Sequence, residues 1–163
     1  MSTEVFVAGV GMTPFQKPGD NEAYPEMAQR AVRGALADAG IDYAQIPEAY
    51  VGHVYGDSTS GQRALYEVGM SGVPIINVNN NCSTGSTALF LARRAIERGE
   101  LDCVLALGFE QMSPGARSSQ WTDRPTPLDR VDDLTDTLVG EKQLPLAIRY
   151  FAGAGAEHMK RYG

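Results

Sequence analysis

The sequence predicts an α/β protein built around a largely parallel β-sheet. Short apolar runs recur along the first 110 residues, and segments with apolar residues at helical spacing separate them. Such runs, bounded by glycine or polar residues, are typical of strands buried on both faces of a sheet. Regular alternation of strand and helix indicates a layered α/β domain. The chain has 163 residues, of which 43% are hydrophobic, so it is long enough to bury a core.

The first strand-helix-strand unit is predicted over residues 5–55. Val5–Val10 is a short apolar run and predicts a strand buried on both faces. A helix follows, opened by Pro25 and stopped by Gly40, with alanine and leucine at helical spacing between them. Ala49–Tyr55 is rich in residues that favour strands and predicts the second strand.

Two more helices and two more strands complete the predicted series. Residues 62–70 predict a short helix, and Val73–Val78 predicts a buried strand that leads into the polar segment Asn79–Gly85. The next helix begins near Gly85 and ends at Gly99, and Leu101–Gly108 gives the fourth strand. The expected order through Gly108 is therefore β-α-β-α-β-α-β.

The regular pattern stops after Glu110. Residues 113–139 contain several prolines and an acidic group of aspartates, and they predict a long surface loop with a solvated acidic face. One or two short helices are expected around residues 145–148 and 156–162, without a further strand. We therefore expect two parts, an α/β part over residues 1–112 and a second part over residues 113–163.

Composition and charge exclude several classes of function. The net charge is −6 and lysine and arginine form no run, so nucleic acid is excluded as a partner. The longest apolar runs are far shorter than the ~20 residues that span a bilayer, which argues against membrane insertion. The N-terminus does not resemble a secretory signal, so we expect a protein of the cytoplasm, or of the peroxisome in a eukaryote. In a reducing compartment its two cysteines stay free thiols.

Cys82 is the candidate nucleophile. It lies between a predicted buried strand and the start of the next helix, in a segment of asparagine, serine and threonine. The free N–H groups of a helix N-terminus stabilise a thiolate, and they can also hold the oxyanion that forms when a nucleophile attacks an acyl group. Gly85 and the small residues around it leave the thiol accessible. The alternative is that Cys82 is a small core residue, as most free cysteines are.

The other candidates favour structural roles. Cys103 lies among apolar residues of a predicted strand, which favours a place in the core. His53 lies within the second predicted strand, where a structural role is favoured over that of a general base, and His158 is a weaker candidate. The spacing of histidines and cysteines does not fit a metal site. Pro14 stands where a dinucleotide fingerprint would place its third glycine, so we expect no bound nucleotide or other cofactor.

The segment Asn77–Leu89, with Cys82 inside it, resembles the active-cysteine segment of the thiolase superfamily. Its closest likeness is to the sterol-carrier-protein-x type, often called lipid-transfer thiolases. Further stretches of this sequence resemble the same family and occur in family order along the whole chain: residues 7–13, 56–64, 104–113 and 157–163. Each stretch is weak evidence alone, and together they are strong.

This resemblance implies a fold of two similar α/β halves, each with a five-stranded mixed sheet, and a loop domain inserted in the first half. Residues 1–112 would be the first half, and residues 113–163 the start of the loop domain. The resemblance also implies ping-pong acyl transfer through Cys82. The cysteine takes an acyl group from a 3-oxoacyl-CoA and releases acetyl-CoA, and coenzyme A as co-substrate then collects the shortened chain.

The resemblance assigns further roles to particular residues. The backbone N–H of Cys82 would form part of the oxyanion hole. Phe151, Ala152 and Gly153 fall where the family's loop domain lines the pantetheine and acyl site. Residues 75–78, with the nearby Gln62 and Arg63, resemble dimer-interface segments, so a homodimer or a dimer of dimers is expected.

The sequence also departs from the family pattern. Thiolases are much longer and supply an activating histidine and a second cysteine from a C-terminal half, and neither His53 nor Cys103 matches those motifs. We therefore expect this to be the N-terminal part of a longer enzyme, with feeble turnover by these residues alone. The alternatives are a thiolase-like carbon–carbon lyase or condensing enzyme, and a noncatalytic subunit that binds acyl-CoA or lipid. The presence of Cys82 argues against the retro-aldol lyases.

Overall fold

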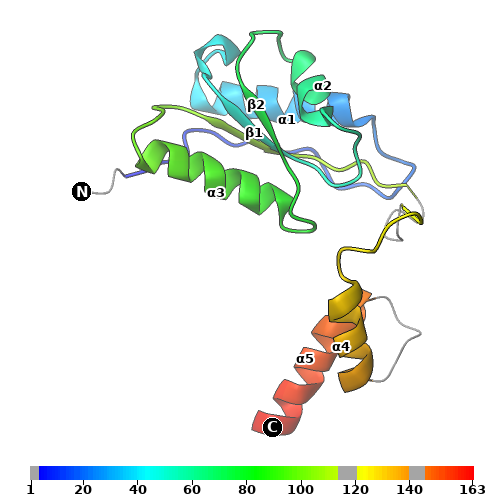
Figure 1. The fold of residues 1–163 in the computed structure, drawn as a ribbon. Coiled ribbons are helices and arrows are strands. Elements are labelled where there is room, and N and C mark those ends of the chain that lie inside the picture. The colour runs from blue at the N-terminus through cyan, green and yellow to red at the C-terminus, as the bar shows by residue number, and fades with distance from the viewer. Residues whose placement is uncertain (1–3, 114–120, 140–145) are drawn as a thin grey trace. The chain divides into compact units, whose positions relative to one another are not determined.

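The computed structural model describes residues 4–113, 121–139 and 146–163. The chain divides into two compact units, Met1–Ala116 and Arg117–Gly163, which are described separately. The first unit holds a parallel sheet with helices on both of its faces, and the second is a pair of helices (Figure 1). The predicted α/β class is confirmed.

The sheet of the first unit has the strand order β2-β1-β3, and both strand pairs are parallel. Its strands are β1 (Ala49–Gly52), β2 (Ile75–Val78) and β3 (Leu105–Gly108). Gly52 at the end of β1 is in register with the last residues of the other two strands, Val78 and Gly108. The carboxyl ends of the three strands are therefore level, and the segments that follow them leave from one edge of the sheet.

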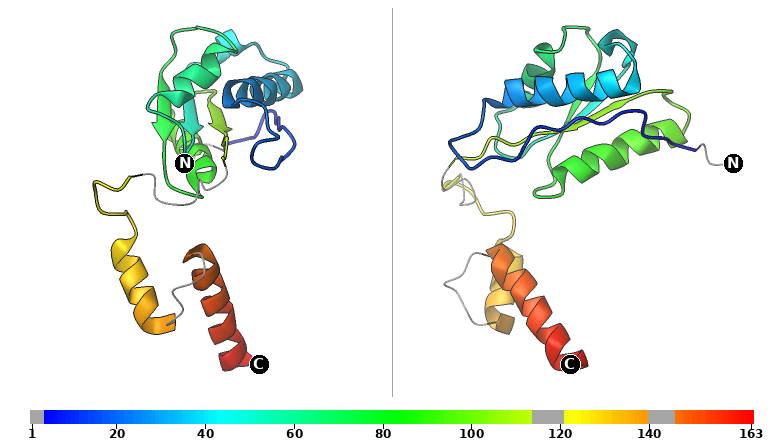
Figure 2. Two further views of the ribbon diagram at one scale, coloured as in Figure 1. Left: turned by 90° about the vertical axis from the view of Figure 1, so that its right-hand side faces the viewer. Right: turned by 180° about the vertical axis from the view of Figure 1, so that it is seen from behind.

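Helices cover the two faces of this sheet unequally. The helices α1 (Tyr24–Ala39) and α2 (Ser60–Tyr66) lie on one face, with a short 3-10 helix (Tyr43–Gln45) following α1. The helix α3 (Thr84–Glu97) covers the opposite face alone (Figure 2). The predicted three helices of this part are thus present, each within a few residues of its expected bounds.

The core of the first unit lies between the sheet and α1 and α2. It is made of small and branched apolar side chains that are almost fully buried: Ala28, Val32, Ile46, Ala49, Val51, Ala64, Leu65, Leu105 and Leu107. On the other face, α3 buries only alanines and a threonine against the strands. Because these side chains are small, the backbone of α3 approaches the sheet closely. A Cβ placed on Gly52 or Gly108 would come within 2.6 and 3.3 Å, respectively, of α3 atoms.

The prediction of a buried strand at Val5–Val10 is wrong. This segment is extended but forms no strand, and Phe6 and Val7 remain 80% and 73% exposed. It packs against α1 and pairs with none of the described strands: a Cβ on Gly9 would come within 2.3 Å of the Ala35 carbonyl oxygen. The apolar pattern marks side chains suited to a sheet, but a strand also needs a neighbour whose backbone it can pair with.

The second unit is a helical hairpin of α4 (Asp129–Val139) and α5 (Leu146–Tyr162). The expected surface loop over residues 113–139 is therefore wrong from Asp129 onward, and one long helix stands where one or two short helices were expected near the C-terminus. The parts of these predictions that concern residues 114–120 and 140–145 lie outside the described residues.

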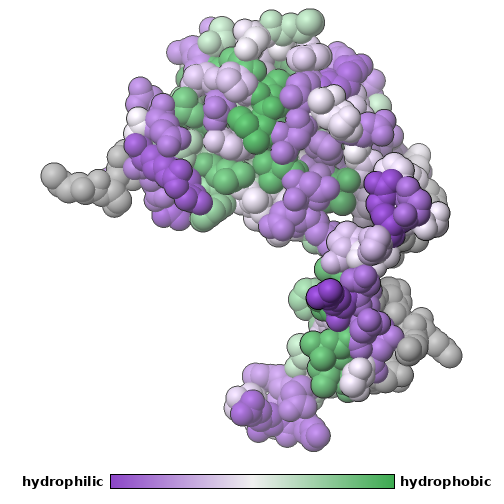
Figure 3. All heavy atoms as spheres, viewed as in Figure 1, coloured by the Kyte–Doolittle hydropathy of each residue, from purple (hydrophilic) through white to green (hydrophobic). Residues whose placement is uncertain are grey.

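Polar side chains hold the hairpin together. Arg149, only 4% exposed, forms an ion pair with Asp136, and the Tyr150 hydroxyl donates a hydrogen bond to Asp132 Oδ1 at 2.6 Å. Two of the aspartates that predicted a solvated face, Asp132 and Asp136, thus make contacts between the helices, whereas Asp129 and Asp133 are exposed. Apolar side chains are left exposed on both helices, among them Leu134 and Phe151 at 59% and 80%, and apolar surface is visible on both units in Figure 3.

Candidate active site

The candidate site lies at the carboxyl edge of the sheet. Residues 53–56 follow β1, residues 79–82 follow β2, and residues 109–110 follow β3. Because the three strands are parallel and end level, these segments lie together at one edge. In open parallel sheets this is the edge at which ligands bind. The sheet therefore places Cys82 where a reactive group is expected.

Cys82 is exposed, and its Sγ lies 3.8 Å from Asn81 Oδ1. The backbone bends sharply just before it, since Asn81 has a φ of +49°, a left-handed conformation that asparagine adopts more readily than most residues. The exposed thiol excludes the alternative in which Cys82 is a core residue. Its role as a nucleophile stays a prediction.

The helix α3 begins two residues after Cys82. Ser83 is the N-cap residue, and its side chain makes no capping hydrogen bond to the first turn. Instead, the Ser83 hydroxyl donates to the Asn80 carbonyl at 2.8 Å. An anion near this end of a 14-residue helix meets a favourable dipole and backbone donors.

Gly85 leaves space beside Cys82. A Cβ added to Gly85 would meet no atom within 4 Å, although this glycine lies in the first turn of α3. The approach to the start of α3 is thus open on this side.

His53 lies just after β1 and is held by a hydrogen-bond network. Its Nε2 is 3.1 Å from Asn77 Oδ1, which also accepts the Gly61 N–H at 2.8 Å. The Asn77 amide nitrogen donates to Gln62 Oε1 at 2.7 Å, so Asn77 Oδ1 is an acceptor and His53 Nε2 carries the proton. The His53 ring also stacks on Phe109, with centroids 5.4 Å apart. These contacts fit the structural role favoured for His53, and they tie the end of β1 to β2 and α2.

Sequence reasoning did not single out Glu110 as a site residue. Its carboxylate accepts the N–H groups of Val54 and Tyr55, at 2.9 and 3.0 Å. It therefore joins the segment after β3 to the segment after β1 at the candidate edge. Its place two residues after an apolar strand, within the family-like stretch 104–113, could have pointed to this role, but that signal is weak.

Of the remaining candidates, Cys103 lies at the other end of the sheet and His158 belongs to the second unit. Cys103 precedes β3 and packs, partly buried, against the core cluster, as expected of a structural thiol. His158 lies on α5 with its ring 4.8 Å from that of Tyr162. Across residues 4–113, 121–139 and 146–163, histidine, cysteine and acidic side chains form no group of three that would suit a metal ion.

Phe151, Ala152 and Gly153 lie on α5 in the second unit. Phe151 and Ala152 are exposed, whereas Gly153 is half-buried. Their expected contact with pantetheine and acyl groups stays a prediction.

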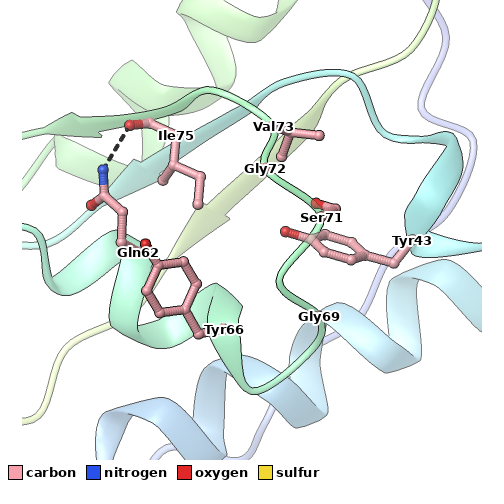
Figure 4. A pocket seen from close by; sticks show the side chains of 8 residues that line it. All are labelled: Tyr43, Gln62, Tyr66, Gly69, Ser71, Gly72, Val73 and Ile75. Carbon is pink, nitrogen blue, oxygen red and sulfur yellow. Dashed lines mark hydrogen bonds between the residues drawn. The ribbon is translucent and has the colours of Figure 1, made fainter.

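A small cavity of about 280 Å³ lies at the other end of β2 (Figure 4). It is lined by residues of the 3-10 helix, of α2 and of the loop before β2: Tyr43, Gln62, Tyr66, Gly69, Ser71, Gly72, Val73 and Ile75. Burial raises the pKa of the Tyr43 phenol. The cavity adjoins Ile75, where β2 begins, whereas Cys82 follows Val78, where β2 ends. It is therefore not the space into which the thiol opens.

The comparison with protein families gives one decisive match. The model of the thiolase N-terminal domain matches residues 5–162, which is almost the whole chain. The chain belongs to the thiolase family. The resemblance found around Cys82 is thereby confirmed, and it extends beyond the first unit into the helical hairpin.

Relatives of this chain include proteins named as sterol carriers and proteins named as thiolases. It is 53% identical to "Sterol carrier protein 2" of Gallus gallus over its full length, which is 30% of the length of that protein. It is 31% identical to "Benzoylsuccinyl-CoA thiolase subunit BbsB" of Thauera aromatica, covering 96% of this chain and 40% of that one. The thiolase-family chain thus spans about a third of the length of these relatives.

A solved structure supports the fold. The 3-oxoacyl-[acyl-carrier-protein] synthase III from Aquifex aeolicus matches 69% of this chain and 37% of its own, with a TM-score of 0.51 and 20% identity. At this identity the likeness concerns the fold alone.

In the described part of the chain, no helix combines the length and the apolar composition needed to cross a bilayer.

Proposed function

We propose that this chain carries the nucleophile of an acyl-CoA thiolase and that Cys82 is that nucleophile. The observation that carries the proposal is an exposed thiol at the N-terminus of α3 and at the carboxyl edge of the sheet, in a member of the thiolase family. A helix N-terminus favours the thiolate and supplies N–H donors to an oxyanion. The relative named as a benzoylsuccinyl-CoA thiolase subunit supports a CoA thioester as substrate.

The proposed reaction proceeds in two acyl transfers. The Cys82 thiolate attacks the 3-keto carbon of a 3-oxoacyl-CoA, a sulfur–carbon bond forms, and the bond between C2 and C3 breaks. Acetyl-CoA leaves after its C2 takes up a proton. The thiol of a second coenzyme A then attacks the acyl-cysteine, which regenerates the Cys82 thiol. His53 is engaged with Asn77 and Cys103 packs against the core, so we assign neither of them a proton transfer.

We assign substrate binding to the second unit. Residues 113–163 would begin a loop domain that covers the substrate, with Phe151, Ala152 and Gly153 against the pantetheine and acyl groups. The exposed side chain of Phe151 supports this assignment, because an apolar side chain at 80% exposure is available for contact.

The decisive experiment compares two cysteine variants of the protein at its natural length. Cys82→Ser should lower the cleavage of 3-oxoacyl-CoA by at least ~10³-fold and abolish the acyl adduct seen by mass spectrometry. Cys103→Ser is the matched control, since Cys103 packs against the core, and it should retain both the adduct and turnover. An acyl adduct that persists in the Cys82→Ser variant would contradict the proposal.

A noncatalytic role in carrying sterol or lipid is the second candidate. It is favoured by the name of the relatives that are 53% identical, "Sterol carrier protein 2". The two candidates differ in what Cys82 does. Binding of a fluorescent sterol that is unaffected by Cys82→Ser, in a wild-type protein that does not cleave 3-oxoacyl-CoA, would favour the carrier role.

We further propose a homodimer that forms through the outer edge of β2. This strand lies at the end of the sheet order, so one of its edges faces away from β1, and such an edge can pair with a second copy. Sedimentation at the monomer mass would contradict this. We also propose, as a separate point, that the protein resides in the cytoplasm, or in peroxisomes in a eukaryote. Imaging of a tagged protein tests this.

A further inference from the structure

Thr84 has an unusual place beside Cys82. It is only 5% exposed, although it lies in the first turn of a helix whose N-terminal segment is otherwise exposed. Its hydroxyl accepts the N–H of Asn80 at 2.8 Å and donates to the carbonyl oxygen of Asn81 at 2.5 Å. One buried hydroxyl thus binds both residues that precede Cys82.

These contacts fix the peptide unit that contains the nitrogen of Cys82. The Asn81 carbonyl oxygen accepts a second hydrogen bond from the backbone N–H of Thr84, at 3.0 Å. In a planar trans peptide the C=O and the N–H point in opposite directions. Because Thr84 holds the Asn81 carbonyl from the side of α3, the Cys82 N–H of the same peptide unit points away from Thr84.

The sheet holds Thr84 from the other side. A Cβ placed on Gly52, at the end of β1, would come within 2.6 Å of the Thr84 methyl carbon and 2.9 Å of its carbonyl oxygen. The methyl therefore packs against the strand while the hydroxyl binds the bend. This double contact restricts the side chain, so the hydroxyl stays directed at Asn80 and Asn81.

The bend needs such support. Asn81 has a φ of +49°, a left-handed conformation that costs free energy for a residue with a side chain, though less for asparagine than for most. Hydrogen bonds to the two sides of the bend offset that cost and keep one orientation of the Asn81–Cys82 peptide. Without the Thr84 hydroxyl fewer hydrogen bonds hold this peptide, and the direction of the Cys82 N–H is less restricted.

We infer that Thr84 is a positioning residue that orients the backbone N–H of Cys82 as an oxyanion donor. This inference rests on the proposed function. The relevant step is the attack of the Cys82 thiolate on a thioester carbonyl. In the half-reaction with acetyl-CoA, a bond forms between the Cys82 sulfur and the acetyl carbon, the bond to the CoA sulfur breaks, and the proton of the cysteine goes to the CoA thiolate.

The test uses two reactions of the same thiol. Acetylation of Cys82 by acetyl-CoA passes through an oxyanion, whereas alkylation by iodoacetamide does not. Thr84→Val keeps the shape and removes the hydroxyl, so it should slow acetylation by about tenfold or more, up to the ~10²–10³-fold that complete loss of one oxyanion donor costs. It should slow alkylation far less. Thr84→Ser restores the hydroxyl and should recover most of the acetylation rate.

Thr135→Val is the matched control for loss of a buried threonine hydroxyl. Thr135 is 8% exposed, and its hydroxyl donates within α4 to the Val131 carbonyl at 2.8 Å. This variant should leave the ratio of acetylation to alkylation unchanged. A wild-type ratio in Thr84→Val, or an equal loss in Thr84→Ser, would overturn the inference.

A second measurement separates this inference from the proposed function. The amide resonances of Asn80 and Cys82 should shift in Thr84→Val and stay near their wild-type positions in Thr84→Ser. If they do not move in Thr84→Val, the positioning role fails, whatever the chemistry of Cys82. If they move as expected and wild-type Cys82 is never acylated, the proposed function fails instead.

Discussion

The two units of this chain are held together by different forces. The first buries alanine, valine and leucine between a parallel sheet and two helices, and Leu65 is fully buried there. The second joins two helices through Arg149, Tyr150 and their aspartate partners, and it leaves large apolar side chains exposed. A buried apolar core therefore contributes most to the cohesion of the first unit, whereas polar contacts carry much of that of the second.

The largest expected effect comes from the apolar core. Leu65→Ala should lower the free energy of unfolding by about 2–5 kcal/mol, because it leaves a cavity in the packed core. Phe151→Ala, which removes a larger side chain that is 80% exposed, should change it by less than about 0.5 kcal/mol. Hydrogen exchange followed by mass spectrometry reports each unit separately. Equal losses in the two variants would show that Phe151 is buried in solution.

The next effect concerns the polar contact of the hairpin. Arg149→Met keeps an apolar stem but leaves Asp136 without this guanidinium, and we expect a loss of about 1–3 kcal/mol, seen as faster exchange in α4 and α5. Removing one partner of a fully buried pair costs ~3–5 kcal/mol, and the Asp136 side chain is 24% exposed, which reduces the cost.

The matched control for this variant lies in the first unit. Arg30→Met breaks the pair with Glu22, in which both side chains are about half exposed, and it should cost less than about 0.5 kcal/mol. A loss of similar size in both variants would mean that the polar contact of the hairpin is no stronger than an ordinary surface pair.

The smallest expected change in stability comes from two glycines. Gly85 in α3 and Gly155 in α5 both have open space where a Cβ would be. Gly85→Ala and Gly155→Ala should each stabilise their helix by at most about 1 kcal/mol. Only Gly85→Ala should slow acetylation of Cys82, because its methyl narrows the approach to the start of α3. Equal acetylation rates in the two variants would show that substrate does not pass over Gly85.

The sequence predicted the first unit better than the second, for a physical reason. The apolar spacing of α1, with Pro25 at its start and a left-handed Gly40 at its end, specifies the helix locally. In the hairpin the acidic pattern predicts a solvated loop, because Arg149 and Tyr150, the partners of Asp136 and Asp132, lie on another helix. A local pattern does not reveal contacts between residues that are distant in sequence.

The candidate site shows the same division. By itself the sequence determined the α/β class, the family, and Cys82 at the junction of a strand and a helix, since all three depend on local pattern and motif. Only the tertiary structure decided that the strand ends are level, that Val5–Val10 pairs with none of the described strands, and that Thr84 binds the bend before Cys82. These features depend on which backbone groups find partners, and that is settled when separate segments pack together.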